Sequence, residues 1–593
     1  LWLPAGIAQA GGWEFPADGT RGLGRGGARM ARADDPSIMT RNPAALALLW
    51  DDQAMLGAHL PIIDACMQPT GAYGWGVRSG DAFDLGEGAI YPLAQPGDTD
   101  LEGEPLTTLF VDEAYPEVCY EGGSTFLPQI GLSMKLSDDL GVGLGFFPPD
   151  SAALYQWGNR DGTVDTDNGL RPNPLRYYRS HQNVTFFSLL SAAGYRVTPW
   201  LSVGAGFQWM LAVYSATTWS TPISALDPHN DVRGDLFGRD LFVPGLIASV
   251  HAQPLDTLDI ALGFKWSDRV KSNVKLDITT GAFGTGEVFE YIDGETGQAA
   301  TVGSSIPTTA HNQPGVVDSP PIWAPQLSLG VRWSQPLKPR FRDLKLAQEV
   351  SDGKVEDAMA TERWDVELDV IYYFSSVYDR AQFTTRDASL ELLTLDESGV
   401  MATIPASPGD CLERDEDGQN CIGDRLVKTD YHGKDQLTVR LGGDYNVLPG
   451  LLAVRAGASY ETAAQDPDDI NVLTYMLSRV GLHAGATVRV ADKTDISIGY
   501  GHFIHESVRL QVNDDNPVSR YPPKYKTEDY NFQPGAGVPG QDGTGAEAGG
   551  FDGTAGVEVP NADQGQPLGP YFINAGSYYF NLDVISVSFT QHF

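Results

Sequence analysis

Alternation between apolar residues and small or polar residues is the dominant pattern along this chain. Between residues 479 and 490, aliphatic side chains run from Val480 to Val490 at alternate positions, whereas Arg479, His483 and Arg489 occupy positions between them. A period of two places alternate side chains on opposite faces of a β-strand. The pattern therefore predicts an all-β protein.

Fourteen runs of this kind occur, which is an even number. The longest keeps its register over 21 residues, from Leu258 to Ile278, beyond the ~3 to 10 residues of ordinary globular strands. The predicted strands are 52–64, 126–137, 140–149, 183–198, 200–218, 241–254, 258–280, 323–335, 362–376, 432–446, 451–463, 479–492, 494–511 and 577–593.

The connections between these runs alternate in length. Tight turns at 137–139, 198–199, 253–256, 448–450 and 492–493 interleave with segments of 15 to 65 residues. Short turns on one side and long loops on the other are typical of outer-membrane barrels. We therefore predict a 14-stranded antiparallel transmembrane β-barrel. One connection, 336–363, departs from the pattern, and a short helix is expected there at about 344–360.

Composition narrows the function classes. The 593 residues include 40 Lys plus Arg against 77 Asp plus Glu, a formal net charge of -37. Nucleic acid is a poor partner for such a chain, because its phosphates are bound by clustered Lys and Arg. The mean hydropathy of -0.21 and the lack of an apolar run of about 18 residues argue against spanning helices, but they are compatible with alternating barrel strands.

The beginning of the sequence carries an export signal. Residues 1–10 end in Ala8-Gln9-Ala10 after a short apolar stretch, which is typical of the end of a signal peptide. The expected organisation is a signal remnant at 1–10, an N-terminal unit at 11–50 and a barrel at 51–593.

Four cysteines, Cys66, Cys119, Cys411 and Cys421, are compatible with an oxidising compartment. They allow three pairings. Cys66 with Cys119 and Cys411 with Cys421 is favoured, because each pair then closes one loop. A zinc site is the weaker alternative, since no CxxC spacing occurs, and no metal site is predicted.

Residues 19–47 carry a more specific signal. In this stretch the chain resembles the FadL family of outer-membrane transporters for long-chain fatty acids and other hydrophobic compounds. The pieces that carry the resemblance are Gly22-Leu23-Gly24-Arg25, Asp34-Asp35 and Asn42-Pro43-Ala44. The resemblance implies a hatch at 11–50 that closes the barrel, external loops that gather ligand, and a kinked third strand that releases it sideways into outer-membrane lipid. The expected function is passive uptake of fatty acids or hydrocarbons at the cell outer membrane.

Two of these motifs also have simpler interpretations. The glycines at 22, 24 and 27 match a dinucleotide fingerprint, but no strand precedes them. Tight turns within a crowded lumen explain them better. The Asn42-Pro43 pair is either a structural turn or a turn that moves to open the path.

The third predicted strand holds the candidate lateral gate. Its glycines are expected to face the lumen, and it ends in prolines that cannot donate to the ladder. The alternative is that the glycines make room for the hatch and the prolines merely end the strand. The gate residues are Gly141, Gly143, Gly145, Phe147 and Pro148.

Ligand-binding candidates fall into two sets. Apolar side chains on loops expected at 219–240 and 281–322 offer a capture surface: Trp219, Leu236, Phe237, Phe283 and Phe289. Lumen cations could bind a fatty-acid carboxylate: Lys265, Arg440, Arg455 and Arg489. The alternative for these cations is simple charge balance with acids on adjacent strands: Asp365, Glu367 and Asp369.

The sequence does not predict an enzyme. No GxSxG motif occurs, and His502 and His505 lie three apart on one strand and so face opposite sides. No cofactor is expected, apart from loosely bound Ca²⁺ on the acidic stretches 161–167 and 413–417. The alternative function is a surface binding or structural barrel whose large acidic loops mediate cell contact, assembly or cation bridging. A water-filled porin is the third option.

Overall fold

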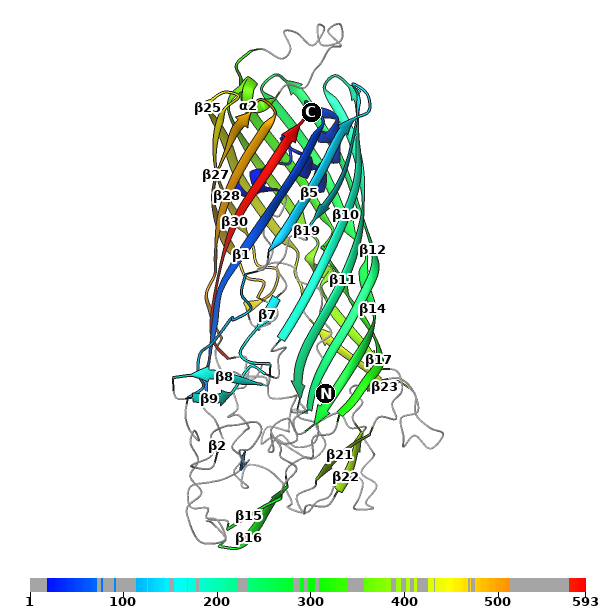
Figure 1. The fold of residues 1–593 in the computed structure, drawn as a ribbon, viewed down its shortest axis with the longest axis vertical. Coiled ribbons are helices and arrows are strands. Elements are labelled where there is room, and N and C mark those ends of the chain that lie inside the picture. Colours follow the sequence, from blue (N-terminus) through cyan, green and yellow to red (C-terminus); the bar gives the residue numbers. More distant parts are fainter. Residues whose placement is uncertain are drawn as a thin grey trace.

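A computed structural model gives the fold of the chain (Figure 1). The residues that it describes are 19–71, 76–77, 90–91, 114–124, 126–148, 154–160, 162–167, 169–176, 181–220, 232–280, 288–292, 297–303, 309–338, 357–385, 391–395, 401–405, 410–412, 425–430, 432–467, 470, 475–510 and 575–593.

The main sheet contains 22 strand segments that join into one closed antiparallel barrel of fourteen strands. Several of these barrel strands consist of two segments. In chain order the segments are β1 (Gln53–Pro69), β4 (Val118–Cys119), β5 (Leu127–Lys135), β6 (Leu140–Phe147), β7 (Leu154–Gln156), β10 (His181–Thr198), β11 (Leu201–Ser220), β12 (Val232–Leu255), β13 (Leu258–Ser267), β14 (Arg269–Thr280), β17 (Thr309–Pro321), β18 (Gln326–Pro336), β19 (Glu362–Tyr373), β20 (Arg380–Thr385), β23 (Asp410–Cys411), β24 (Arg425–Asp430), β25 (Gln436–Leu448), β26 (Leu452–Glu461), β27 (Arg479–Ala491), β28 (Thr494–His505), β29 (Val508–Leu510) and β30 (Gly576–His592). The last strand pairs with the first, from Gln53–His592 to Pro69–Gly576, and closes the barrel.

Short elements complete the described part of the chain. The helices are α1 (Thr20–Gly24), η1 (Pro36–Thr40), η2 (Pro43–Leu48), α2 (Ala358–Thr361) and η5 (Ser375–Val377). Four small hairpin sheets lie outside the barrel wall, formed by β2 (Gly76–Val77) with β3 (Ile90–Tyr91), β8 (Thr163–Thr166) with β9 (Gly169–Pro172), β15 (Val288–Ile292) with β16 (Ala299–Gly303), and β21 (Glu391–Leu395) with β22 (Met401–Pro405).

The prediction of fourteen barrel strands is confirmed, and every predicted run overlaps one barrel strand. The alternation also has the expected consequence, because one set of side chains faces inward and is buried. The outward set is apolar: Leu246, Leu329 and Leu482 are 51%, 43% and 52% exposed. An isolated soluble barrel would expose this apolar band to water, so the outward face needs an apolar surrounding.

The predicted loops at 219–240 and 281–322 are too long. The β11–β12 hairpin extends to residues 220 and 232, and β17 occupies 309–321. These strands extend the wall, and their inner side is apolar, with Tyr214, Leu236 and Phe383 in one buried cluster. Leu236 and this cluster therefore stabilise the extended wall from within. Trp219 lies on the opposite face of β11, with Ser215 and Thr217, and is 1% exposed. Both side chains belong to wall strands and are buried, so the predicted position of Trp219 and Leu236 on an exposed loop is wrong.

The predicted helix at about 344–360 matches only α2 at its end, since residues 339–356 lie outside the described residues. Asp357 begins α2 by accepting a hydrogen bond from the Met359 amide. No helix in the described ranges is both long and apolar enough to cross a membrane.

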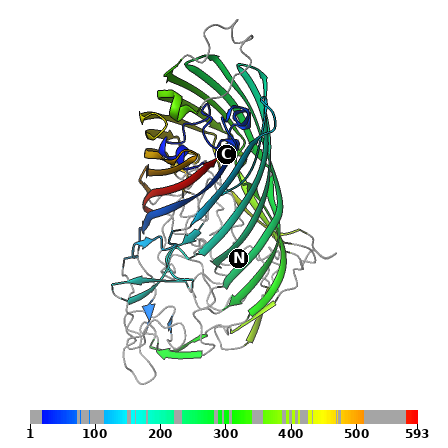
Figure 2. The same cartoon turned by 45° about the horizontal axis from the view of Figure 1, so that its top comes forward.

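Residues 19–49, here called the N-terminal segment, lie inside the barrel (Figure 2). The segment is almost entirely buried. Glycines on the inner wall make its close approach possible: a Cβ at Gly204 would lie 2.2 Å from the Ala44 nitrogen, and one at Gly141 would lie 2.2 Å from the Leu46 oxygen. The wall and the segment are therefore in backbone contact at these positions.

We expect Gly204→Ala to lower the free energy of unfolding by about 1–3 kcal/mol, because the new methyl group overlaps the Ala44 backbone. Urea unfolding in detergent, together with trypsin cleavage in the N-terminal segment, measures the effect. The control is Gly206→Ala on the same strand, where the nearest atom is the Ala192 Cβ at 3.2 Å. Equal stability and protease resistance of the two variants would contradict this packing.

Candidate functional site

The N-terminal segment is attached to the wall by Arg25, whose side chain is completely buried. Its guanidinium contacts three carboxylates, Asp365 at 2.7 Å, Asp444 at 2.6 Å and Glu367 at 3.1 Å. Arg32 reaches the same acids from the other side, forming an ion pair with Asp365 and lying 3.3 Å from Asp444. Buried charges are stable only when paired and hydrogen-bonded in this way.

The acids of β19 also accept backbone hydrogen bonds from the segment. Asp369 accepts from the amides of Arg29 at 2.9 Å and Met30 at 3.0 Å, and Glu367 accepts from the Ala31 amide at 2.5 Å. The charge balance that the sequence suggested between adjacent strands is therefore made mainly with the N-terminal segment. Sequence reasoning missed this, because contacts across more than 300 residues have no local signal.

Asp34 and Asp35, from the predicted hatch motif, organise the segment internally. Asp34 contacts Arg29 at 3.0 Å and Arg32 at 3.0 Å. Burial alone would raise the pKa of Asp34, but the guanidiniums of Arg29, Arg32 and Arg21 outweigh it and hold the pKa well below its usual value. Asp35 caps η1 by accepting from the Ser37 amide at 2.9 Å.

Asn42, Pro43 and Ala44 join η1 to η2. The Asn42 side chain donates to the Met30 carbonyl at 2.8 Å and lies 3.0 Å from the His251 Nδ1, and the Ala44 amide donates to the Ser249 hydroxyl. Pro43 is the first residue of η2, where its missing N–H costs nothing. In this structure the motif is an anchored turn. Whether it moves stays a prediction.

In the described part of the wall, strand pairing is interrupted between β1 and β10. On one side of β1, pairing with β5 stops at His59 and resumes with β4 at Cys66. On the facing side, β10 pairs with β6 up to Ser188 and with β7 from Asn183. Among the described residues, none pairs with 60–64 or with 184–187 on these edges. We call this interruption the wall opening.

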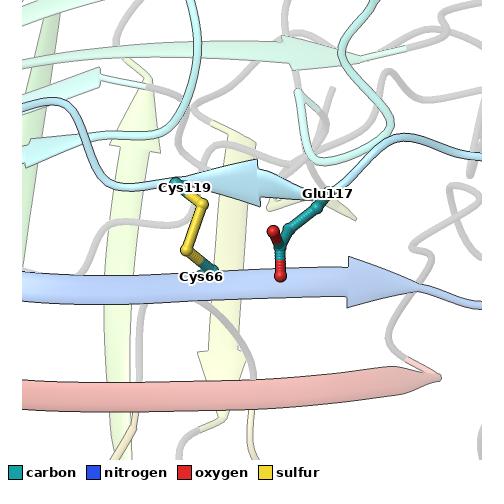
Figure 3. Close-up of side chains that lie close together, drawn as sticks. All are labelled: Cys66, Glu117 and Cys119. Carbon is teal, nitrogen blue, oxygen red and sulfur yellow. A yellow bond between two sulfur atoms is a disulfide. The ribbon is translucent and has the colours of Figure 1, made fainter. Parts of the chain in front are cut away.

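A short stretch of paired backbone closes the wall opening at the end nearer the last residues of β1. β4 pairs with β1, and Cys66 and Cys119 form a disulfide there (Figure 3). Tyr120 then pairs with Trp157, which follows β7. The disulfide is the pairing favoured from the sequence. Since both sulfurs are bonded, Glu117 beside them has no thiolates to share a metal with. The pairing of Cys411 with Cys421 lies outside the described residues.

The predicted gate residues lie on the opposite side of the opening, on β6 and just after it. β6 ends at Phe147, which points inward and is buried against Met39, Met55 and Leu190. Added Cβ atoms at Gly141 and Gly143 would strike the N-terminal segment, whereas one at Gly145 would strike the Phe147 ring. Gly141 and Gly143 therefore make room for the segment, and the strand end at Phe147 and Pro148 borders the opening. The interpretation that the glycines make room for the hatch describes Gly141 and Gly143, and the lateral gate stays a prediction.

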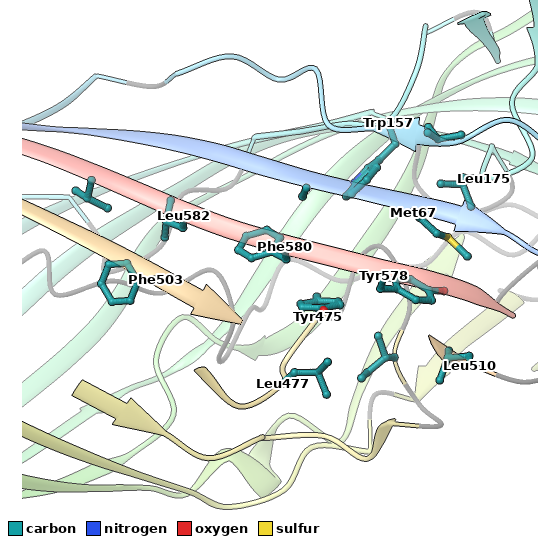
Figure 4. Packing of buried hydrophobic residues seen from close by; sticks show 14 of the residues in the cluster. Met67, Trp157, Leu175, Tyr475, Leu477, Phe503, Leu510, Tyr578, Phe580 and Leu582 are labelled. Atoms are coloured by element: carbon teal, nitrogen blue, oxygen red, sulfur yellow. The ribbon is translucent and has the colours of Figure 1, made fainter. Parts of the chain in front are cut away.

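An apolar cluster lines the lumen between the N-terminal segment and the wall opening (Figure 4). It begins at Leu23 of α1 and includes Ala65 of β1 and Trp157 beyond β7. Aromatic rings form its centre: Tyr475, Phe503, Tyr578 and Phe580. Sequence reasoning did not select these residues, although alternation places Phe503 of β28 and Tyr578 and Phe580 of β30 on the inner face; Tyr475 lies outside the strands, before β27.

The predicted ligand-binding residues are scattered. Trp219 is only 1% exposed and stacks near Arg176, whereas Phe237 is 50% exposed on the outer wall. Phe283 lies outside the described residues, and only the backbone of Phe289 is described, in β15. The Lys265 ammonium lies 3.8 Å from the ring centre of Trp323. The structure does not bring this set together.

The three arginines differ in their partners. Arg455 lies 3.3 Å from Asp444, and Arg489 contacts Asp495 at 2.7 Å and Asp357 at 2.6 Å. Arg440 is 4% exposed, lies opposite Asp369 in the register of β19 and β25, and donates to the Tyr373 hydroxyl at 3.5 Å. In the described part of the molecule its Nε and Nη1 have no hydrogen-bond partner. Arg440 is therefore a buried cation with donors to spare.

Comparison with known proteins gives a fold. No family model matches the chain, and no curated protein sequence matches it. Among solved structures, a Pseudomonas aeruginosa FadL homologue aligns with a TM-score of 0.55 at 14% identity, over 98% of this chain and 100% of the other. The P. putida toluene transporter TodX aligns with a TM-score of 0.51 at 10% identity, over 97% and 98%. The resemblance drawn from residues 19–47 is thus confirmed at the level of fold.

We expect Arg25→Met to lower the free energy of unfolding by about 3–5 kcal/mol, because it leaves Asp365, Glu367 and Asp444 without their shared cation. Urea unfolding in lipid vesicles measures this change. Arg269→Met is the matched control: its ion pair with Asp318 is about one third exposed, and its loss should cost at most about 1 kcal/mol. Similar losses in the two variants would rule out the anchoring role of Arg25.

Proposed function

We propose that this protein is an outer-membrane channel for passive uptake of hydrophobic molecules, which leave the lumen sideways through the wall opening. The observation that carries the proposal is the continuity between the apolar lumen cluster and that opening. Ala65 and Trp157 belong to the cluster and lie next to the unpaired edges. An apolar ligand gains ~25 cal/mol per Å² of surface removed from water, so such a lining favours its capture over that of polar solutes.

The N-terminal segment supports the same proposal as a hatch. It occupies the lumen beside the opening, with Met39 and Leu46 packed against Phe147. A ligand that leaves through the wall does not have to pass this anchored segment. The fold also agrees, since the similar structures are those of a FadL homologue and a toluene transporter.

A row across neighbouring strands favours an amphipathic acid as the substrate. In register, Arg440 pairs with Ser459, Ser459 with Gly481, Gly481 with Phe503, Phe503 with Leu582 and Leu582 with Ile63. Five steps of about 4.8 Å cover about 24 Å of inner wall. The row starts at a cation with free donors, crosses two small residues and ends in apolar side chains at the edge of the opening. This length suits a long acyl chain with its carboxylate at Arg440 better than a single aromatic ring.

We expect Ala65→Trp to reduce uptake of a long-chain fatty acid several-fold, because the bulky ring fills the passage between the cluster and the opening. Uptake of radiolabelled oleate by cells expressing the barrel measures this. Ala58→Trp on the outward face of the same strand is the control, and heat-modified gel mobility verifies that both variants fold. Uptake equal to wild type in the Ala65 variant would refute sideways exit at this place.

We expect Arg440→Gln to weaken fatty-acid binding about 10- to 100-fold, the value of one lost charge-assisted hydrogen bond, and to leave toluene uptake unchanged. Arg440→Lys should restore part of the fatty-acid affinity. Mass spectrometry of lipids that co-purify with wild type and both variants gives an independent readout. Unchanged fatty-acid binding in the Gln variant would exclude Arg440 as the carboxylate anchor. A ligand-free wild-type barrel would favour the surface-binding alternative.

A further inference from the structure

A polar cavity of about 630 Å³ lies in the extended part of the wall, between β10, β11, β12 and β14. Two cross-strand rows form its floor. One row is His181, Thr217, Asp235 and Asp277, and the next is Asn183, Ser215, Phe237 and Lys275. No part of the uptake path uses these residues.

The cavity faces outward, away from the lumen. Leu236 and Leu276 lie between its two rows and point the opposite way, buried in the inner apolar cluster. Phe237 is correspondingly exposed. Arg160, in the turn that follows β7, forms one side wall, and its Nη2 donates to the Asp235 carboxylate at 3.0 Å.

The height of the cavity can be estimated along β12. The outward apolar band continues past Trp209 to Leu241 and Phe242 on this strand, and both are exposed. Asp235 is six residues from Leu241 along β12, or about 20 Å at about 3.3 Å per residue. With barrel strands tilted about 45°, the cavity lies roughly 14 Å above the edge of the band. This is the level of headgroups rather than of acyl chains.

The chemistry of the lining favours a neutral polyol. Two carboxylates, Asp235 and Asp277, balance two cations, Arg160 and Lys275, so neither a free anion nor a metal ion is favoured. Carboxylates, amides and hydroxyls in one cavity both donate and accept hydrogen bonds, as vicinal hydroxyl groups require. Phe237 adds an exposed aromatic face for the apolar side of a sugar ring.

We propose that this cavity binds the neutral saccharide part of a glycolipid in the outer leaflet of the surrounding membrane. The inference rests on the proposed outer-membrane function only for the orientation of the barrel. A saccharide held there attaches the extended wall to the lipid surface next to the strands β10, β11 and β12.

The test uses the full-length barrel in detergent, freed of co-purified lipid, and isothermal titration calorimetry. The probe is a neutral hexose oligosaccharide of the outer-core type of lipopolysaccharide, free of Kdo and phosphate, and maltose is the free-saccharide arm. The variants are Phe237→Ala and Asp277→Asn. Asn273→Ala is the control, since it is exposed on the same face of β14 but lies outside the cavity.

The expected result is binding of the core oligosaccharide to wild type and to the Asn273 variant, weakened at least about tenfold in the Phe237 and Asp277 variants. The absence of binding to wild type, or equal binding by all variants, would overturn the proposal. Maltose binding as tight as that of the oligosaccharide would overturn the assignment to a glycolipid. Oleate uptake, measured on the same variants, separates the two proposals: normal uptake without saccharide binding refutes only this one, whereas saccharide binding without any uptake refutes the channel.

Discussion

The fully buried contact of Arg25 with Asp365, Glu367 and Asp444 determines how the rest of the molecule is arranged. Three acids on an inner wall cannot remain charged in a closed barrel without cations. The wall brings Arg332 to Asp365 and Arg455 to Asp444, whereas Arg25 is the cation that contacts all three acids. The N-terminal segment brings Arg25 and Arg32 and receives the β19 acids on its own backbone amides as well. Barrel and segment therefore form one electrostatic unit, in which neither part is neutral alone.

The interior is divided by this arrangement. Ionic contacts fill the part around the N-terminal segment, and an apolar, aromatic lining begins at Leu23 and continues to the wall opening. Arg440 lies where the two regions meet, buried and with unused donors in the described structure. One cation at the border of an apolar surface is the arrangement that distinguishes an amphipathic ligand from both water-soluble ions and plain hydrocarbons.

The sequence was sufficient to predict the barrel strands, because each strand repeats the same two-residue period. This period identifies the lumen-facing positions without any tertiary information. It was insufficient where position depends on distant partners. From the sequence, Trp219 and Leu236 were expected on an exposed loop. The strands of the wall extend past them, and both side chains are buried. Arg440, Arg455 and Arg489 are alike in sequence, and only the positions of Asp444, Asp357 and Asp495 distinguish the paired ones from Arg440. The outward cavity was missed because its lining comes from five strands and two segments outside them.

The frame around the wall opening has a mechanical consequence. Backbone pairing passes the gap on one side through β5 and β6. On the other side it runs through β4, Tyr120, Trp157 and β7. If the unpaired edges reached the end of the barrel, the two strands could separate along their whole length. Because paired backbone lies on both sides of the gap, lateral tension in the bilayer is carried around it by continuous strand pairing. The barrel can thus stay closed although the described strands leave these edges of β1 and β10 unpaired.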